Sequence, residues 1–368
     1  MSPDVEILLI AVVTAIAAAL PGAFLVLRRL ALVSDAISHA ILPGIVVAFF
    51  ITGDLNSPLL LMAAAATGVL TVALIEAIHR SRLVPEDAAI GLVFPALFAL
   101  GVILVSRYAG NVHLDTDSVL LGELAFAPFD RFVFRGVDLG PAALWSMGAI
   151  LVLNVVVIVV AYKEFKLATV DAGLAAALGF SPVLLHYGLM GLVSITAVGA
   201  FNAVGSVLVV ALMIAPPATA YLLAERFKAM LWLSAAIAAV GAVAGYGMAW
   251  VLDVSIAGSM ATACGVLFFA ALLFAPRRGV VAQMQRRAAQ RLDFGVSMLL
   301  VHLLHHEDSA EAAEECRRST LNCHLRWSEG FTRQVVRSAD GHDLVARAGE
   351  LLELTGAGRT RALQDVVR

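Results

Sequence analysis

Asp35 and His39 are the residues of this sequence whose types and spacing best fit metal chemistry. They are four residues apart, so on a helix their side chains occupy one face, one turn apart. A carboxylate and an imidazole placed in this way form half of a site for Mn²⁺, Fe²⁺ or Zn²⁺. Ionisable side chains are costly inside a membrane and usually mark a pathway. A second interpretation also stands, in which an Asp–His hydrogen bond only holds two helices together.

The stretch that contains this pair, SDAISHAILPG at residues 34–44, has two further features. Pro43 cannot donate a backbone hydrogen bond and Gly44 is flexible, so we expect the helix to loosen just beyond the pair. A ligating imidazole usually donates its other N–H to a neighbour, and Ser34 and Ser38 are expected to make such contacts.

The composition indicates which solvent surrounds these residues. The chain has 368 residues, of which 61% are hydrophobic and 14% charged, whereas soluble domains contain roughly 25% charged residues. The mean hydropathy is +0.91. Residues 1–276 are therefore expected to form an all-α integral membrane domain. The net charge of −3 gives no general attraction for nucleic acid.

Apolar runs of about 20 residues predict eight or nine membrane-spanning helices. The predicted spans are 6–27, 32–52, 58–78, 88–106, 142–162, 184–201, 204–223, 230–251 and 256–275. The pair 184–201 and 204–223 is separated by a very short junction, so each is a full span or a partial, re-entrant helix. Lys and Arg in short loops place the C-terminus in the cytoplasm. The N-terminus is then outside with nine spans and inside with eight or ten.

At Arg277 the composition changes abruptly. Residues 277–368 contain fourteen Arg, twelve Asp or Glu and five of the nine His. We expect a basic linker helix at 277–292 and a small cytosolic α(+β) domain at 293–368. The simplest interpretation of its His and Cys residues is a scattered surface set, because their spacing matches no known closed metal site; these are His302, His305, His306, Cys316, Cys323 and His324.

The predicted outer segment at 107–141 contains further candidate metal ligands, His113, Asp115 and Glu123. Acidic residues at the mouth of a pathway raise the local concentration of cations. The alternative is an ordinary solvated loop.

Three stretches, taken in order, resemble the permease subunits of ATP-binding-cassette (ABC) importers for manganese, zinc and iron. They are SDAISHAILPGIVVAF from Ser34, VDAGLAAALGF at 170–180 and VGSVLVVALMIAPPATAYLLAER at 204–226. The resemblance covers roughly residues 5–276 and implies a multi-pass protein of the bacterial inner membrane. It also implies that Asp35 and His39 line the metal path. A His-rich tract, which zinc members often carry, does not occur in residues 1–276, and this favours manganese or iron over zinc. Manganese is the first expectation, with iron and zinc as alternatives.

The resemblance also implies a docking site for a separate ATPase subunit. Asp171, Ala175 and Gly179 follow a four-residue period, which predicts a small-residue helix face that another protein can approach closely. An ordinary Ala-rich connector is the alternative. Ala215-Pro216-Pro217-Ala218 is either a second contact with the ATPase or a helix kink.

The C-terminal segment resembles, in part, the winged-helix domain of metal-dependent repressors. The resemblance implies a helix at about 328–338 with Arg333 and Arg337 on one face, followed by a turn at Asp340-Gly341 and short apolar segments. Because its charge is nearly balanced, binding to nucleic acid is not expected, and regulation of the transporter or stabilisation of a dimer is the preferred role.

These observations predict the permease subunit of an ABC importer for a divalent metal. No G-x-x-x-x-G-K-[ST] motif occurs in the sequence, so the chain is not expected to hydrolyse ATP by that route or to act as an enzyme. Its expected partners are an ATPase, an extracytoplasmic metal-binding protein and a second permease, identical or paralogous. No tightly bound cofactor is expected, and the metal is cargo. An ion-coupled secondary carrier and a membrane-anchored metal-responsive regulator are the alternatives.

Overall fold

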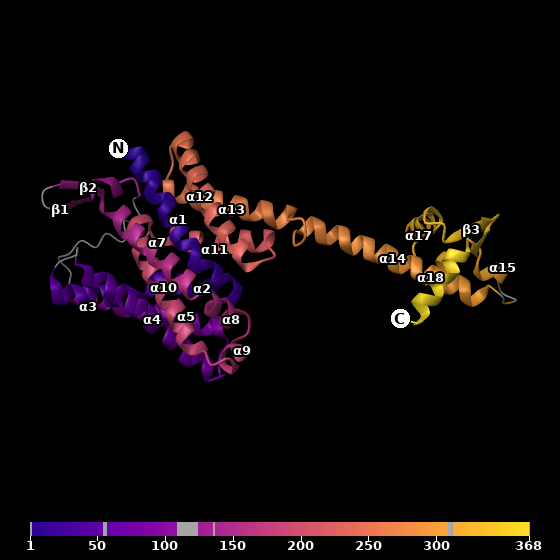
Figure 1. The fold of residues 1–368 in the computed structure, drawn as a ribbon, viewed down its shortest axis with the longest axis horizontal. Helices are drawn as coiled ribbons and strands as arrows, with labels where there is room; N and C mark the ends of the chain where they lie inside the picture. Colours follow the sequence, from indigo (N-terminus) through magenta and orange to yellow (C-terminus); the bar gives the residue numbers. More distant parts are fainter. Residues whose placement is uncertain are drawn as a thin grey trace. The chain divides into compact units, whose positions relative to one another are not determined.

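The structure, a computed structural model, describes residues 2–53, 57–108, 124–134, 137–307, 309 and 312–367. The chain divides into two compact units, Met1–Pro276 and Arg277–Arg368 (Figure 1). The elements of the first unit are α1 (Pro3–Arg28), α2 (Ala31–Ala40), α3 (Leu42–Thr52), α4 (Pro58–Arg80), α5 (Glu86–Tyr108), η1 (Ala127–Phe129), β1 (Arg131–Phe134), β2 (Val137–Pro141), α7 (Ala142–Val160), α8 (Tyr162–Val170), α9 (Ala172–Ala177), α10 (Pro182–Val204), α11 (Ser206–Leu223), α12 (Phe227–Leu252) and α13 (Ile256–Phe274).

Within the described part of the chain, nine helical segments are long and apolar enough to cross a membrane, with α2 and α3 counted together. This confirms the prediction of a helical membrane domain with eight or nine spans. The two segments that were open to interpretation are α10 and α11, of 23 and 18 residues, joined at Gly205. Each is long enough to be a span by itself.

The first helix lies at the centre of this unit. α1 packs against α7, α10, α11 and α12, and most of its middle is buried because Ala15 and Ala17–Ala19 are small enough to let neighbouring helices approach. Phe24 lies edge-on between the rings of Phe165 and Phe227, at centroid distances of 5.7 and 5.0 Å. The core of the unit is therefore built around α1.

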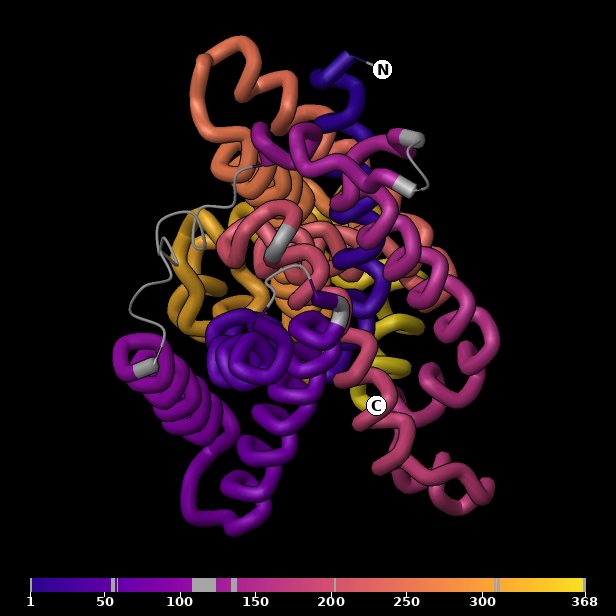
Figure 2. The backbone as a smooth tube through the Cα atoms, turned by 90° about the vertical axis from the view of Figure 1, so that its left-hand side faces the viewer, coloured from indigo at the N-terminus to yellow at the C-terminus, as the bar shows by residue number. Residues whose placement is uncertain are grey.

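The two ends of the unit are distinct. Figures 1 and 2 place the N-terminus, the β1–β2 hairpin and the α12–α13 turn at one end, and α8, α9 and the α4–α5 turn at the other. The first end carries the acidic residues of the N-terminal turn of α1, whereas the basic residues Arg80 and Arg82 lie at the second.

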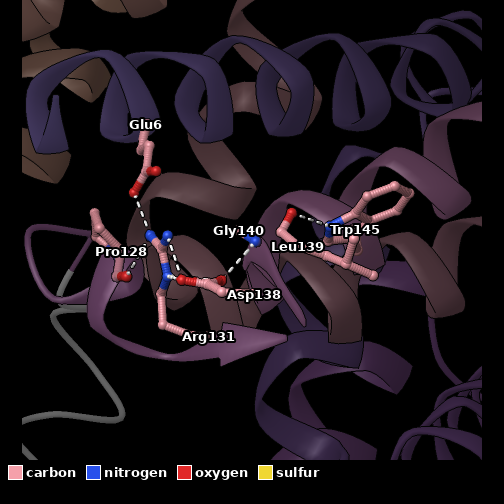
Figure 3. Close-up of polar contacts among 7 residues, drawn as sticks. All are labelled: Glu6, Pro128, Arg131, Asp138, Leu139, Gly140 and Trp145. Atoms are coloured by element: carbon pink, nitrogen blue, oxygen red, sulfur yellow. Dashed lines mark hydrogen bonds and ion pairs between the residues drawn. The ribbon is translucent and has the colours of Figure 1, made fainter. Parts of the chain in front are cut away.

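A three-residue ion-pair network fastens the hairpin to α1 (Figure 3). β1 and β2 are antiparallel, and Arg131 pairs with Glu6 of α1 at 2.8 Å and with Asp138 of β2 at 2.8 Å. The Asp138 carboxylate also accepts a hydrogen bond from the backbone N–H of Gly140 at 2.9 Å. Hydrogen bonds from Arg131, and then that from Gly140, lower the pKa of Asp138.

The second unit is mostly helical, with one antiparallel hairpin. Its elements are α14 (Val280–His306), α15 (Ala312–Glu315), α16 (Leu321–His324), α17 (Glu329–Gly341), β3 (Val345–Ala348), β4 (Leu351–Leu354) and α18 (Gly356–Val367). The predicted boundary between linker and domain, at 292/293, falls inside the continuous helix α14. The second half of α14 supplies Leu299, Leu300 and Leu303 to a core shared with α17 and α18.

One local prediction in this unit needs correction. The helix expected at 328–338 is present as α17, which Ser328 caps by accepting a hydrogen bond from the N–H of Phe331. The turn expected at Asp340-Gly341 is wrong, because those residues complete α17 and the chain turns at His342 and Asp343. The His342 N–H still bonds to the carbonyl of Ser338, which extends helical bonding past the predicted end.

Candidate functional site

Asp35 and His39 lie on α2, the first half of an interrupted helix. α2 ends at Ala40 and α3 begins at Leu42, so the interruption lies at Ile41, just before Pro43. Pro43 has no N–H and therefore cannot make the helical hydrogen bond that the carbonyl of His39 would accept. The break occurs next to the predicted metal ligands.

The pair has the geometry that its spacing predicts. His39 Nε2 lies 3.5 Å from Asp35 Oδ1, and the exposed fractions of the side chains are 30% for His39 and 44% for Asp35. The imidazole faces two rings of α5, with centroid distances of 6.1 Å to Phe94 and 6.5 Å to Phe98. The carboxylate and imidazole thus share one helix face beside the rings of Phe94 and Phe98, and both side chains remain partly exposed.

The expected roles of Ser34 and Ser38 are not supported. Both residues are buried, whereas Asp35 and His39 are partly exposed. Ser34 donates its hydroxyl to the carbonyl of Ala31 at 3.0 Å, and Ser38 donates to the carbonyl of Ser34 at 2.9 Å. Hydroxyls in helices commonly bond to backbone carbonyls three or four residues earlier. Both hydroxyl protons are therefore donated within α2, and among the described residues neither hydroxyl makes a hydrogen bond to His39.

Close packing holds the interrupted helix in place. α2 contacts α4, α5, α10 and α11, and α3 contacts α4 and α5. A Cβ atom on Gly44 would lie only 2.6 Å from the carbonyl oxygen of Ala63 and 2.1 Å from Thr67 Oγ1. Only glycine allows α3 and α4 to approach this closely. The residues following the break are therefore fixed against a rigid neighbour.

The other predicted metal ligands, His113, Asp115 and Glu123, lie outside the described residues. Asp171, Ala175 and Gly179 are described, but they do not form one helix face. Asp171 is extended and caps α9 by accepting a hydrogen bond from the N–H of Leu174 at 2.9 Å. Gly179 follows the helix with a φ of 88°, a left-handed conformation that ends it. Asp171 and Gly179 flank a six-residue helix and Ala175 is buried inside it, so the predicted small-residue face is not formed.

The large apolar side chains that this segment exposes belong to other residues. Val170, Leu174 and Leu178 are 78%, 49% and 61% exposed, and none lies in a membrane-spanning helix. Apolar side chains exposed in this way usually mark a contact with another protein. Val170 ends α8, whereas Leu174 lies in α9 and Leu178 caps it, so the surface comes from their exposure and not from a shared helix face.

The Pro pair is not a surface turn. Pro216 and Pro217 are both buried within α11, which continues from Ser206 to Leu223. Of the two interpretations of this motif, the structure favours a feature of a packed membrane helix.

Sequence reasoning missed a polar network at the end that carries α8 and α9. Arg28 donates from Nε to Thr169 Oγ1 at 3.1 Å and approaches His186 Nδ1 at 3.3 Å. Because guanidinium only donates, Nδ1 of His186 is the acceptor and carries no proton. Nearby on α10, Tyr187 donates to Glu76 of α4 at 2.6 Å. Isolated charged residues at span ends were the only signal in the sequence.

Comparisons with known proteins agree with this architecture. The model of the ABC 3 transport family matches residues 5–275. The chain is 48% identical over 353 residues to the zinc transport system membrane protein TroD of Treponema pallidum, covering 96% of both chains. It is 49% identical over 286 residues to the manganese transport system membrane protein MntD of Bacillus subtilis, covering 78% of this chain and 97% of MntD.

The relatives also differ in length. The match to TroD spans 353 residues and so includes most of the second unit. The match to MntD spans 286 residues, which is 97% of MntD but only 78% of this chain. Among solved structures, PsaBC from Streptococcus pneumoniae in complex with Fab has a TM-score of 0.63 at 28% identity and covers 76% of this chain and 94% of that chain. With its nine candidate spans and a family match over nearly the whole first unit, this chain is a multi-pass membrane protein that belongs to the ABC 3 transport family.

Proposed function

We propose that this chain is the membrane-spanning permease subunit of an ABC importer that moves a divalent transition metal into the cytoplasm. The observation that carries the proposal is the Asp35–His39 pair, on one face of an interrupted membrane helix and partly exposed. A carboxylate and an imidazole suit first-row divalent ions. Manganese is the first candidate and zinc and iron are the alternatives, since the relatives are named for manganese and zinc.

The exposure of the pair supports a path between two permease subunits. An ionised Asp in a membrane helix is costly when it faces lipid. Asp35 is 44% exposed in the single chain, so a second chain, identical or paralogous, is expected to cover it. Two such faces would supply up to four ligands, which suits an ion that must bind and then leave.

Energy would come from a separate ATPase bound at α8 and α9. The exposed apolar residues Leu174 and Leu178 give that partner a surface to bury. An extracytoplasmic metal-binding protein would deliver the ion at the opposite end, where the N-terminus and the β1–β2 hairpin lie (Figure 2). In this orientation the C-terminal unit is cytoplasmic.

The second unit would regulate transport or stabilise the dimer. A winged-helix arrangement is supported by α17 followed by the β3–β4 hairpin, with Arg333 and Arg337 exposed on α17. The near balance of Arg and acidic residues gives no strong attraction for nucleic acid.

The test is uptake of labelled Mn²⁺, Zn²⁺ and Fe²⁺ by cells that lack their own importers and express this chain with its ATPase and binding protein. Asp35→Asn removes the charge and keeps the shape, so uptake should be abolished while membrane insertion is unchanged. Asp87→Asn, the same change at an exposed position in the first turn of α5, is the matched control. Wild-type uptake by Asp35→Asn would exclude the pair from the path.

A further inference from the structure

The second unit contains a cluster of imidazole and carboxylate side chains outside the transport path. His302 and His306 lie one turn apart near the end of α14, with ring centroids 4.7 Å apart. Glu315 is the last residue of α15 and His324 the last of α16. α15 contacts α14 (Figure 1). Three separate helices therefore bring four potential metal ligands to one place.

The side chains are close and largely shielded from solvent. His302 Nε2 lies 3.5 Å from Glu315 Oε2 and 3.1 Å from the Glu315 carbonyl oxygen. His324 Nδ1 lies 3.0 Å from the same carboxylate oxygen, Oε2. The exposed fractions of these side chains are 13% for His302, 21% for Glu315 and 28% for His324.

The distances suit a single ion. One ligand atom from each of His302, His306 and Glu315 lies within 4.8 Å of the other two. Ligand atoms bound to a tetrahedral ion at about 2.1 Å are roughly 3.5 Å apart. Binding would therefore shorten the distances between the three atoms by at most about 1.3 Å, which side-chain rotation at the end of a helix allows.

A purely structural ion-pair cluster would need fewer residues. His324 already pairs with the Glu315 carboxylate and His302 Nε2 already lies within hydrogen-bond distance of the Glu315 carbonyl oxygen, so this alternative gives His306 no role. A bound metal would use His306 as a ligand, and His324 would hold the ligating carboxylate of Glu315. Ligating carboxylates are usually held by a further hydrogen bond, and His324 is placed to provide one.

We propose that His302, His306 and Glu315 bind a divalent first-row transition metal, and that His324 holds the carboxylate in position. Imidazole and carboxylate ligands suit Zn²⁺, Co²⁺, Fe²⁺ and Mn²⁺. Three protein ligands leave a coordination position open, as in sites that exchange water or other ligands. The ion would tie the end of α14 to α15 and α16. This site goes beyond the proposed transport function, because none of its ligands lies in a membrane helix.

The test uses the full-length chain in nanodiscs, with Asp35→Ala and His39→Ala introduced so that the transport path cannot contribute. Equilibrium dialysis against Zn²⁺ and against Mn²⁺, together with the visible absorption of bound Co²⁺, measures binding. We expect one ion per chain. His306→Ala should weaken binding at least about tenfold. His305→Ala, an exposed neighbour on the same helix, should bind like its parent.

Thermal unfolding without metal controls for folding. His306→Ala and His305→Ala should melt alike when metal is absent, and only the His305→Ala chain should gain stability when metal is added. Equal binding by the two variants would overturn the proposal, as would no binding by the parent. Neither result bears on transport, which the Asp35→Asn experiment tests separately.

Discussion

Arg28, at the end of α1, donates a hydrogen bond from Nε to Oγ1 of Thr169 in α8, over a distance of 3.1 Å. Its Nη1 lies 3.3 Å from His186 Nδ1 on α10. One guanidinium thus connects the central helix of the membrane unit, a second membrane helix and the segment that leads into α9. If α9 binds the ATPase, a movement there would reach the core of the permease through this contact.

The first prediction tests that connection. Removing a charge-assisted hydrogen bond costs about 1.5–3 kcal/mol, so Arg28→Met should loosen α8 and lower the metal transported per ATP hydrolysed. Arg29→Met changes an adjacent, exposed Arg and should leave that ratio unchanged. Uptake and ATP hydrolysis would be measured together in proteoliposomes. An unchanged ratio for Arg28→Met would show that the contact only supports the fold.

The second prediction concerns the exposed apolar residues Leu174 and Leu178. Full burial of a Leu side chain contributes about 1.5–3 kcal/mol, so Leu174→Asp and Leu178→Asp should each weaken binding to the ATPase by roughly tenfold or more. Ala172→Asp places the same charge on the other side of α9 and is the control. Co-purification and titration with the ATPase give the affinities. If both Leu variants bind like Ala172→Asp, another surface forms the docking site.

Gly179 is a poor probe of the same surface. Its φ of 88° is strained for any side chain, and a Cβ there would meet no atom within 4 Å. A large residue at Gly179 would distort the end of α9 rather than block a close contact. The Leu variants keep the backbone and are therefore the sharper test.

Some features followed from the sequence because they depend on short-range pattern. The spans could be predicted since hydropathy accumulates over about 20 consecutive residues. Asp35 and His39 share a face because helical geometry places residues four apart together. The same rule failed for Asp171 and Gly179, because they lie outside α9. This helix has only six residues, with Asp171 as its N-cap and the left-handed Gly179 just after its end.

Other features depend on contacts between distant segments. Glu315 and His324 meet His302 only because α15 and α16 fold back against α14, and no spacing in the sequence reports this. Likewise, Arg28 and Thr169 are 141 residues apart. Ser34 and Ser38 direct their hydroxyl groups to backbone carbonyls of their own helix, and this local bonding competes with the contact to His39 that the sequence predicted.

The third prediction concerns the close approach of α3 and α4. Gly44→Ala would place a Cβ 2.6 Å from the backbone carbonyl of Ala63, which cannot move without shifting α4. Overpacking of this kind costs about 1–3 kcal/mol. Gly91→Ala, in the interior of α5 with no atom within 4 Å of a Cβ, is the control and should be neutral or stabilising. Thermal unfolding of the purified variants should rank them in this order, and equal midpoints would contradict it.

The fourth prediction follows from the hairpin network (Figure 3). Hydrogen bonds from Arg131 lower the pKa of Asp138 in the folded protein, so this pairing stabilises the hairpin above the unfolded pKa of about 3.9. That contribution is lost as the pH falls through the still lower pKa of the folded state. Below pH 4, the Gly140 N–H should lose protection from hydrogen exchange in the wild type. In Arg131→Met, protection should already be reduced at pH 7, and wild-type protection there would contradict the assignment.

The last prediction separates the two units. Residues 1–276 have their own core, and MntD has no counterpart to most of the second unit. Truncation after Arg278 should therefore leave an inserted permease that still binds the ATPase and transports metal. If the second unit regulates transport, the truncated chain should lose the response of uptake to cytosolic metal. His306→Ala in the full chain should reproduce that loss if the proposed metal site is the sensor, with His305→Ala as control. Loss of the truncated protein from the membrane would show instead that the second unit is needed for assembly.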